Sequence, residues 1–143
     1  MHGLKPLVWI VWLGLVMIGV EVRHLHAKIV GQPAAALPLI FCGIAVVLVP
    51  LCLVRTTRLS RSTLIAFFAI GALLGVVGVY YHTKFQAEPF LQLFTAERSS
   101  GPQPLVPLSL TGLCMLGALA ARLLPHETRA ETSTRLSRQA LDR

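Results

Sequence analysis

Long stretches of this sequence contain no charged residue. Asp, Glu, Lys and Arg make up 13% of the 143 residues, against roughly 25% in soluble globular proteins. None of the four occurs at positions 6–20, 29–54, 62–83 or 99–121. Hydrophobic residues make up 55% of the chain, and its mean hydropathy is +0.70. Charge-free runs of this length exclude a water-soluble core and indicate an integral membrane protein.

The sequence also lacks any pattern of paired cysteines. Cys42, Cys52 and Cys114 lie in apolar stretches, without Cys-x-x-Cys or cysteine–histidine spacing. If Cys42 and Cys52 share a helix, about 15 Å separates them along its axis, which is too far for a disulfide. The cysteines are therefore interpreted as small buried apolar residues, and a disulfide framework or zinc site is disfavoured.

Motifs that would mark an enzyme, a transporter or a nucleic-acid-binding protein are missing too. The chain has no nucleotide-binding glycine loop, no Gly-x-Ser-x-Gly and no His-Glu-x-x-His. The middles of its apolar runs contain no ionisable residue, whereas proton and ion pathways usually need one. The net charge of +7 is not accompanied by basic runs interleaved with aromatics, so we expect no nucleic-acid partner.

The charge-free runs themselves predict four transmembrane helices, because continuous apolar stretches can cross a bilayer only as helices. The expected fold class is an all-α integral membrane four-helix bundle. Its spans are placed at about 4–24, 34–54, 63–82 and 105–124, within a transmembrane domain of residues 1–125. Residues 126–143 form a basic tail. The first span could instead be a cleaved signal peptide, but Leu25-His26-Ala27 puts a leucine where cleavage needs a small residue, which favours retention.

The distribution of basic residues predicts the orientation. One side of the four spans receives nine of the thirteen Lys and Arg residues and the other side four. The tight connection between the second and third spans carries the strongest bias, with Arg55, Arg58 and Arg61. The positive-inside rule therefore predicts that both termini, and the tail, are cytoplasmic. We expect a multi-pass protein of a bacterial cytoplasmic membrane.

Titratable residues gather at the ends of the first and third spans. Glu21, His24 and His26 lie at the outer end of the first span, and His82 lies at the outer end of the third. Glu21 and His24 are three residues apart and share a face if the helix continues. Two interpretations are open. The residues are ordinary interface anchors, or they form an outer site for haem or a transition metal.

Small residues in the third and fourth spans predict close helix packing. Gly71 and Gly75 form a Gly-x-x-x-Gly motif, and Gly78 follows one turn later. Such motifs let helix backbones approach closely, within one bundle or between two chains. Pro38 and Pro50 lie in the second span and are expected to bend it.

These features favour a non-catalytic subunit or accessory factor of a membrane assembly over a self-contained enzyme. The expected partners are the lipid bilayer and another membrane protein or a second copy of the chain. A metal- or haem-binding redox protein that uses the outer cluster is one alternative. A small transporter or pore former is another, which the uncharged interior disfavours. We expect no resident cofactor unless the outer cluster binds haem or a transition metal.

Overall fold

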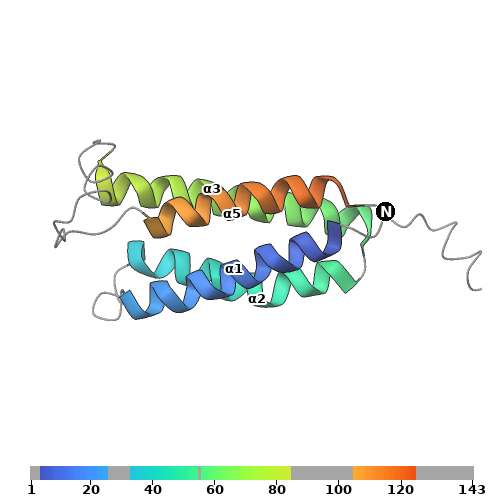
Figure 1. The fold of residues 1–143 in the computed structure, drawn as a ribbon, viewed down its shortest axis with the longest axis horizontal. Coiled ribbons are helices and arrows are strands. Elements are labelled where there is room, and N and C mark those ends of the chain that lie inside the picture. Colours follow the sequence, from blue (N-terminus) through green and yellow to red (C-terminus); the bar gives the residue numbers. More distant parts are fainter. Residues whose placement is uncertain (1–3, 26–32, 55, 85–104, 125–143) are drawn as a thin grey trace, which may run out of the picture.

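The computed structural model describes residues 4–25, 33–54, 56–84 and 105–124. Regular structure in these ranges is entirely helical and forms α1 (Leu4–Leu25), α2 (Pro33–Val54), α3 (Arg58–Thr83) and α5 (Leu105–Arg122) (Figure 1). Each helix is long and apolar enough to cross a membrane. The predicted all-α class with four candidate spans is confirmed.

The helices form an antiparallel bundle in which each packs against two neighbours. α1 contacts α2 and α5, and α3 contacts the same two helices. Among the described residues, no Cα of α1 lies within 8 Å of α3, and none of α2 within 8 Å of α5. These two pairs are therefore the diagonals of the bundle. We call the end where α1 and α3 begin and α2 and α5 finish the Arg58 end, and the opposite end the Tyr80 end (Figure 1).

The core of the bundle follows from apolar residues spaced three and four apart. In α1 these buried positions are Val8, Val11, Leu15, Ile18 and Val22. In α5 they are Pro107, Leu110, Cys114, Gly117, Ala121 and, just beyond the helix, Leu124. This spacing keeps one seam of each helix facing its neighbours, as in left-handed membrane bundles.

α2 is continuous through both of its internal prolines, Pro38 and Pro50. It contacts α3 through a pair of aromatic rings. The ring of Phe41 stacks on the ring of Phe67, with centroids 4.3 Å apart and planes 8° from parallel. Phe41 and Phe67 are both buried. The stacked rings therefore couple the two helices near the middle of the bundle.

α3 begins earlier than its hydropathy predicts, at Arg58 rather than near residue 63. Thr57 is its N-cap, and the Thr57 hydroxyl accepts a hydrogen bond of 3.1 Å from the backbone N–H of Ser60. Hydropathy detects only the part of a helix that lies in lipid, so the capped polar turn was missed. The other expected spans differ from the observed helices by two residues or fewer at each end.

The outer surface of the bundle is as apolar as its core. Within the most apolar window of each helix, only 28–33% of the residues are buried. Large hydrophobic side chains point outward from all four helices, among them Ile10, Leu51, Leu73 and Leu119. A surface of this kind is stable only against lipid or another apolar partner, which supports a membrane location.

Candidate functional site

The tightest part of the bundle is the contact between α3 and α5, and three glycines of α3 form it. A Cβ atom on Gly71 would lie 2.5 Å from the Cys114 sulfur, and one on Gly78 would lie 2.8 Å from the Pro107 Cβ. A Cβ atom on Gly75 would lie 2.8 Å from both the Pro107 carbonyl oxygen and a backbone nitrogen of α5. At Gly75 these neighbouring atoms belong to backbone, where only glycine fits, whereas at Gly71 and Gly78 the nearest atoms belong to side chains. The structure therefore places Gly71, Gly75 and Gly78 inside one bundle, facing a neighbouring helix of the same chain.

Phe68 and Pro107, which the sequence pattern did not indicate as packing residues, complete the contact. Phe68 is fully buried, and a Cβ atom on Gly117 would lie 2.9 Å from its ring. Pro107 provides the surface against which Gly75 and Gly78 pack. Proline is tolerated there because it lies in the first turn of α5, where a backbone N–H has no helical partner.

The interior of the described bundle offers little polar chemistry. The Thr111 hydroxyl donates to the Pro107 carbonyl oxygen at 3.0 Å, and the Thr83 hydroxyl donates to the Val79 carbonyl oxygen at 2.8 Å. Both hydroxyls are thus bonded within their own helix. Thr56 and Thr83 are the buried polar residues of the described chain, and both lie at its helix ends. No polar path crosses the described part of the bundle.

The predicted outer cluster lies at the Tyr80 end, spread over diagonal helices. Glu21 and His24 are exposed near the end of α1, and His82 is half-buried near the end of α3. His26 lies outside the described residues. No group of three His, Cys, Asp or Glu side chains suited to a metal occurs in the described ranges. The metal or haem site stays a prediction, since His26 belongs to it.

A contact between Lys84 and two tyrosine rings at the Tyr80 end was not predicted from the sequence. Lys84 caps α3 in the left-handed conformation, with φ of 49°, and its backbone N–H donates to the Tyr80 carbonyl oxygen at 2.7 Å. Its ammonium lies 4.8 Å from the centre of the Tyr80 ring and 5.3 Å from that of Tyr81. Cation–π contacts of this kind suit a membrane interface. The four-residue spacing of Tyr80 and Lys84 is the sequence feature from which this contact could have been predicted, because such residues are neighbours on a helix surface.

The three cysteines are buried and unbridged, in keeping with their interpretation as core residues. Cys42 lies on α2 and Cys114 on α5, helices that are diagonal to each other. Because no Cα of α2 lies within 8 Å of α5 in the described chain, these two thiols cannot form a disulfide without backbone movement.

Basic residues gather at the Arg58 end. Arg58 and Arg61 stand in the first turn of α3, exposed and half-buried respectively, and Arg122 is exposed at the end of α5. Arg55, the third arginine of the predicted topology signal, lies outside the described residues. Lys5 is exposed at the start of α1. The bundle thus has one basic end and one end of mixed aromatic and titratable character.

Comparisons with models of known families, with curated proteins and with solved structures found no match to this chain.

Proposed function

We propose that this chain is a non-catalytic subunit or accessory factor of a membrane assembly, which acts through contacts made by its outer faces. The observation that carries the proposal is the apolar interior of the described bundle. Phe41, Phe67 and Phe68 are buried in it, and close contacts at the glycines join α3 to α5. The described interior therefore lacks the charged side chains with which a substrate or an ion is usually bound inside a membrane bundle.

The apolar interior also weighs against a transporter or pore former. Selectivity and conduction need rings of carbonyls, charged side chains or broken helices that line a path. The hydroxyl of Thr111, which lies within α5, donates to a carbonyl of its own helix. α2 remains helical through Pro38 and Pro50. The proposed role therefore belongs to the surface of the bundle and to its two ends.

The test is the state of the protein when it is extracted from the cells that make it naturally. We expect a stoichiometric complex with another membrane protein in mild detergent, identified by mass spectrometry and sized by light scattering. A complex that contains only copies of this chain would identify a homo-oligomer. A particle with one 15.5 kDa chain and no partner would contradict the proposal.

Two exposed glycines allow the contact surface to be mapped. A Cβ atom on Gly43 of α2 or on Gly112 of α5 would meet no atom within 4 Å. Leucine at either position should therefore leave the bundle intact while filling an outer face. If a partner packs on one of these faces, Gly43→Leu or Gly112→Leu will release it, and the other variant serves as the matched control. Unchanged unfolding temperatures would show that each variant still folds.

A further inference from the structure

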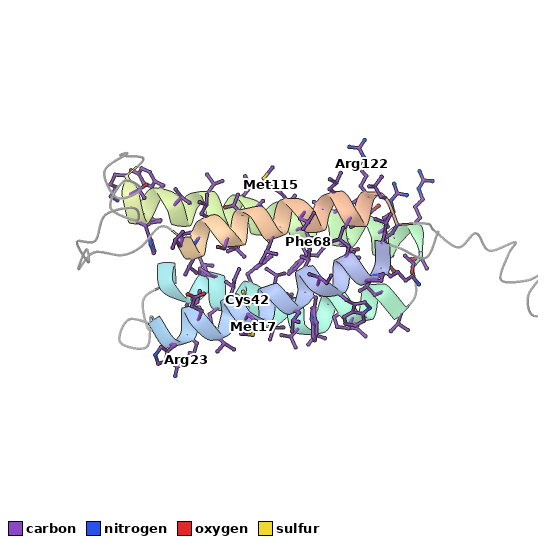
Figure 2. The ribbon with its side chains drawn as sticks, in the orientation of Figure 1. Met17, Arg23, Cys42, Phe68, Met115 and Arg122 are labelled. Carbon is purple, nitrogen blue, oxygen red and sulfur yellow. The ribbon has the colours of Figure 1, made fainter. Side chains whose placement is uncertain are left out.

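Four cations from three helices lie at the Arg58 end, and we call them the basic end cluster. They are Lys5 of α1, Arg58 and Arg61 of α3, and Arg122 of α5. α5, which carries Arg122, packs against both α1 and α3. Figure 2 shows Arg122 extending outward from α5.

The glycine contacts fix how far Arg61 lies from Arg122 along the bundle. Gly71 of α3 faces Cys114 of the antiparallel α5. Arg61 is ten residues before Gly71, and Leu124 is ten residues after Cys114. Arg61 is therefore level with Leu124, about 3 Å along the axis from Arg122 at a rise of roughly 1.5 Å per residue.

The contact between α1 and α5 places Lys5 at the same level. A Cβ atom on Gly14 of α1 would lie 2.9 Å from the Leu113 side chain of α5. Lys5 is nine residues before Gly14, and Arg122 is nine residues after Leu113. Because the two helices are antiparallel, Lys5 and Arg122 lie level. Nine residues make two and a half helical turns, so Lys5 lies on the face of α1 opposite Gly14, and Arg122 lies on the face of α5 opposite Leu113. Lys5 therefore adds positive charge at this level without sharing the face of Arg122.

No carboxylate of the described chain offsets this charge. Glu21 is the one acidic residue in the described ranges, and it lies at the Tyr80 end. A concentration of positive charge at the edge of an apolar bundle fits a negatively charged group held at the membrane surface.

We propose that the basic end cluster binds the phosphodiester groups of anionic phospholipids, with Arg61 and Arg122 as the main contacts. Guanidinium groups bind phosphate oxygens through paired hydrogen bonds, and the adjacent apolar faces of α3 and α5 accept the acyl chains. Leu119, which is exposed and lies one turn from Arg122 on the same side of α5, offers such surface. The site would hold lipid beside the bundle, whatever protein the chain assembles with.

The experiment measures lipid binding by the purified full-length chain in a neutral detergent. Protein in detergent micelles has no membrane orientation. Lipid binding measured there is therefore independent of any effect that the arginines have on topology. Native mass spectrometry and thermal unfolding would be followed with phosphatidylglycerol, with phosphatidylcholine and with inorganic phosphate. We expect phosphatidylglycerol alone to stay bound and to raise the unfolding temperature, and its affinity to fall as salt rises.

Substitutions then locate the site. Combining Arg61→Gln with Arg122→Gln should weaken phosphatidylglycerol binding roughly thirtyfold, if each arginine contributes about 1 kcal/mol. Lysine at both positions should retain most of the binding. Arg23→Gln, which removes an exposed cation at the Tyr80 end, is the matched control and should leave the affinity unchanged. An unaltered unfolding temperature without lipid would show that the double variant folds.

Three results would overturn the proposal. Equal retention of phosphatidylcholine would show that the headgroup charge is not recognised. A full stabilising effect from inorganic phosphate would show binding of a free anion rather than a lipid. An Arg23→Gln variant that loses as much affinity as the double variant would show that the net charge matters and the basic end cluster does not.

Discussion

Thr57 shows how one side chain sets the start of a membrane helix. Its hydroxyl satisfies the backbone N–H of Ser60 and also lies 2.9 Å from the Ser60 hydroxyl. The first turn of α3 stands at the Arg58 end, outside the apolar run, where lipid burial contributes little to helix stability. A local hydrogen bond therefore replaces the bilayer as the reason for helix formation there.

We expect Thr57→Ala to reduce the free energy of unfolding by about 1 kcal/mol, because the Ser60 N–H loses its acceptor. Thr57→Asn should keep most of the stability, since asparagine is also a good N-cap. Ser62→Ala, at an exposed position in the same part of α3, is the control for loss of a hydroxyl and should have little effect. Unfolding in mixed detergent micelles, followed by circular dichroism, measures all three. Equal losses for Thr57→Ala and Thr57→Asn would contradict the capping role.

The histidines at the Tyr80 end can be tested for ligation directly. Glu21 and His24 are exposed, and α1 and α3 are diagonal, so we expect no equimolar metal and no haem band in the gently solubilised protein. Metal analysis and a reduced-minus-oxidised absorption spectrum make the measurement. A signal that disappears when His24, His26 and His82 are replaced by alanine, but persists in His126→Ala, would establish the outer site instead.

The closest helix–helix contact depends on glycines whose apolar surroundings in the sequence do not distinguish them from other glycines of the chain. Gly75 and Gly43 each lie within an apolar helix, yet their surroundings are opposite. A Cβ atom on Gly75 would meet backbone atoms of α5 within 3 Å, whereas one on Gly43 would meet nothing within 4 Å. Sequence spacing identified the first as a packing residue and could not place its partner, because a helix face is compatible with several neighbours.

The matched pair of variants Gly75→Ala and Gly43→Ala tests this difference. A methyl group at Gly75 would overlap the Thr111 hydroxyl and press on the Pro107 carbonyl, so α3 and α5 must separate. We expect a loss of about 1–3 kcal/mol in unfolding free energy. Gly43→Ala should be neutral or slightly stabilising, because alanine favours helix and finds open space. Steric trapping or titration with a denaturing detergent gives both values. Similar effects of the two substitutions would refute the close contact.

The fold was largely predictable, because the bilayer requirement fixes helices wherever charge is missing for about 20 residues. The start of α3 could not be predicted in this way, because it depends on the N-cap residue Thr57, which hydropathy does not detect. The stacking of Phe41 on Phe67 could not be either, because it depends on which helices become neighbours. Lys84 was overlooked for a different reason, as its contact with two tyrosines needs a left-handed residue at the end of α3. Long-range pairing and local backbone conformation are the two things that hydropathy does not encode.

The complete bundle combines an apolar middle with two unlike ends. The Arg58 end carries Lys5, Arg58, Arg61 and Arg122 without a described carboxylate. The Tyr80 end carries two described cations of Lys and Arg type, Arg23 and Lys84, together with Glu21. Charge asymmetry of this kind orients a membrane protein and attracts it to an anionic leaflet at the same time. One set of arginines can therefore serve both insertion and lipid binding.

The orientation can be tested separately, because insertion is decided in the cell. The start of α1 and the end of α5 lie at the same end of the bundle (Figure 1), so reporters on the two termini must agree. We expect a C-terminal fluorescent-protein fusion to fluoresce in a bacterial host and an alkaline phosphatase fusion to be inactive, both of which report a cytoplasmic terminus.

Replacing Arg55, Arg58 and Arg61 together by glutamine removes the strongest part of the charge bias, so a measurable fraction of the chains should invert and the phosphatase fusion should gain activity. Arg23→Gln removes a cation from the opposite side and should leave the phosphatase inactive. High phosphatase activity in the unmodified chain would reverse the predicted orientation and place the basic end cluster on the outer leaflet. The lipid-binding proposal would survive that result, because detergent binding does not depend on which leaflet the cluster faces.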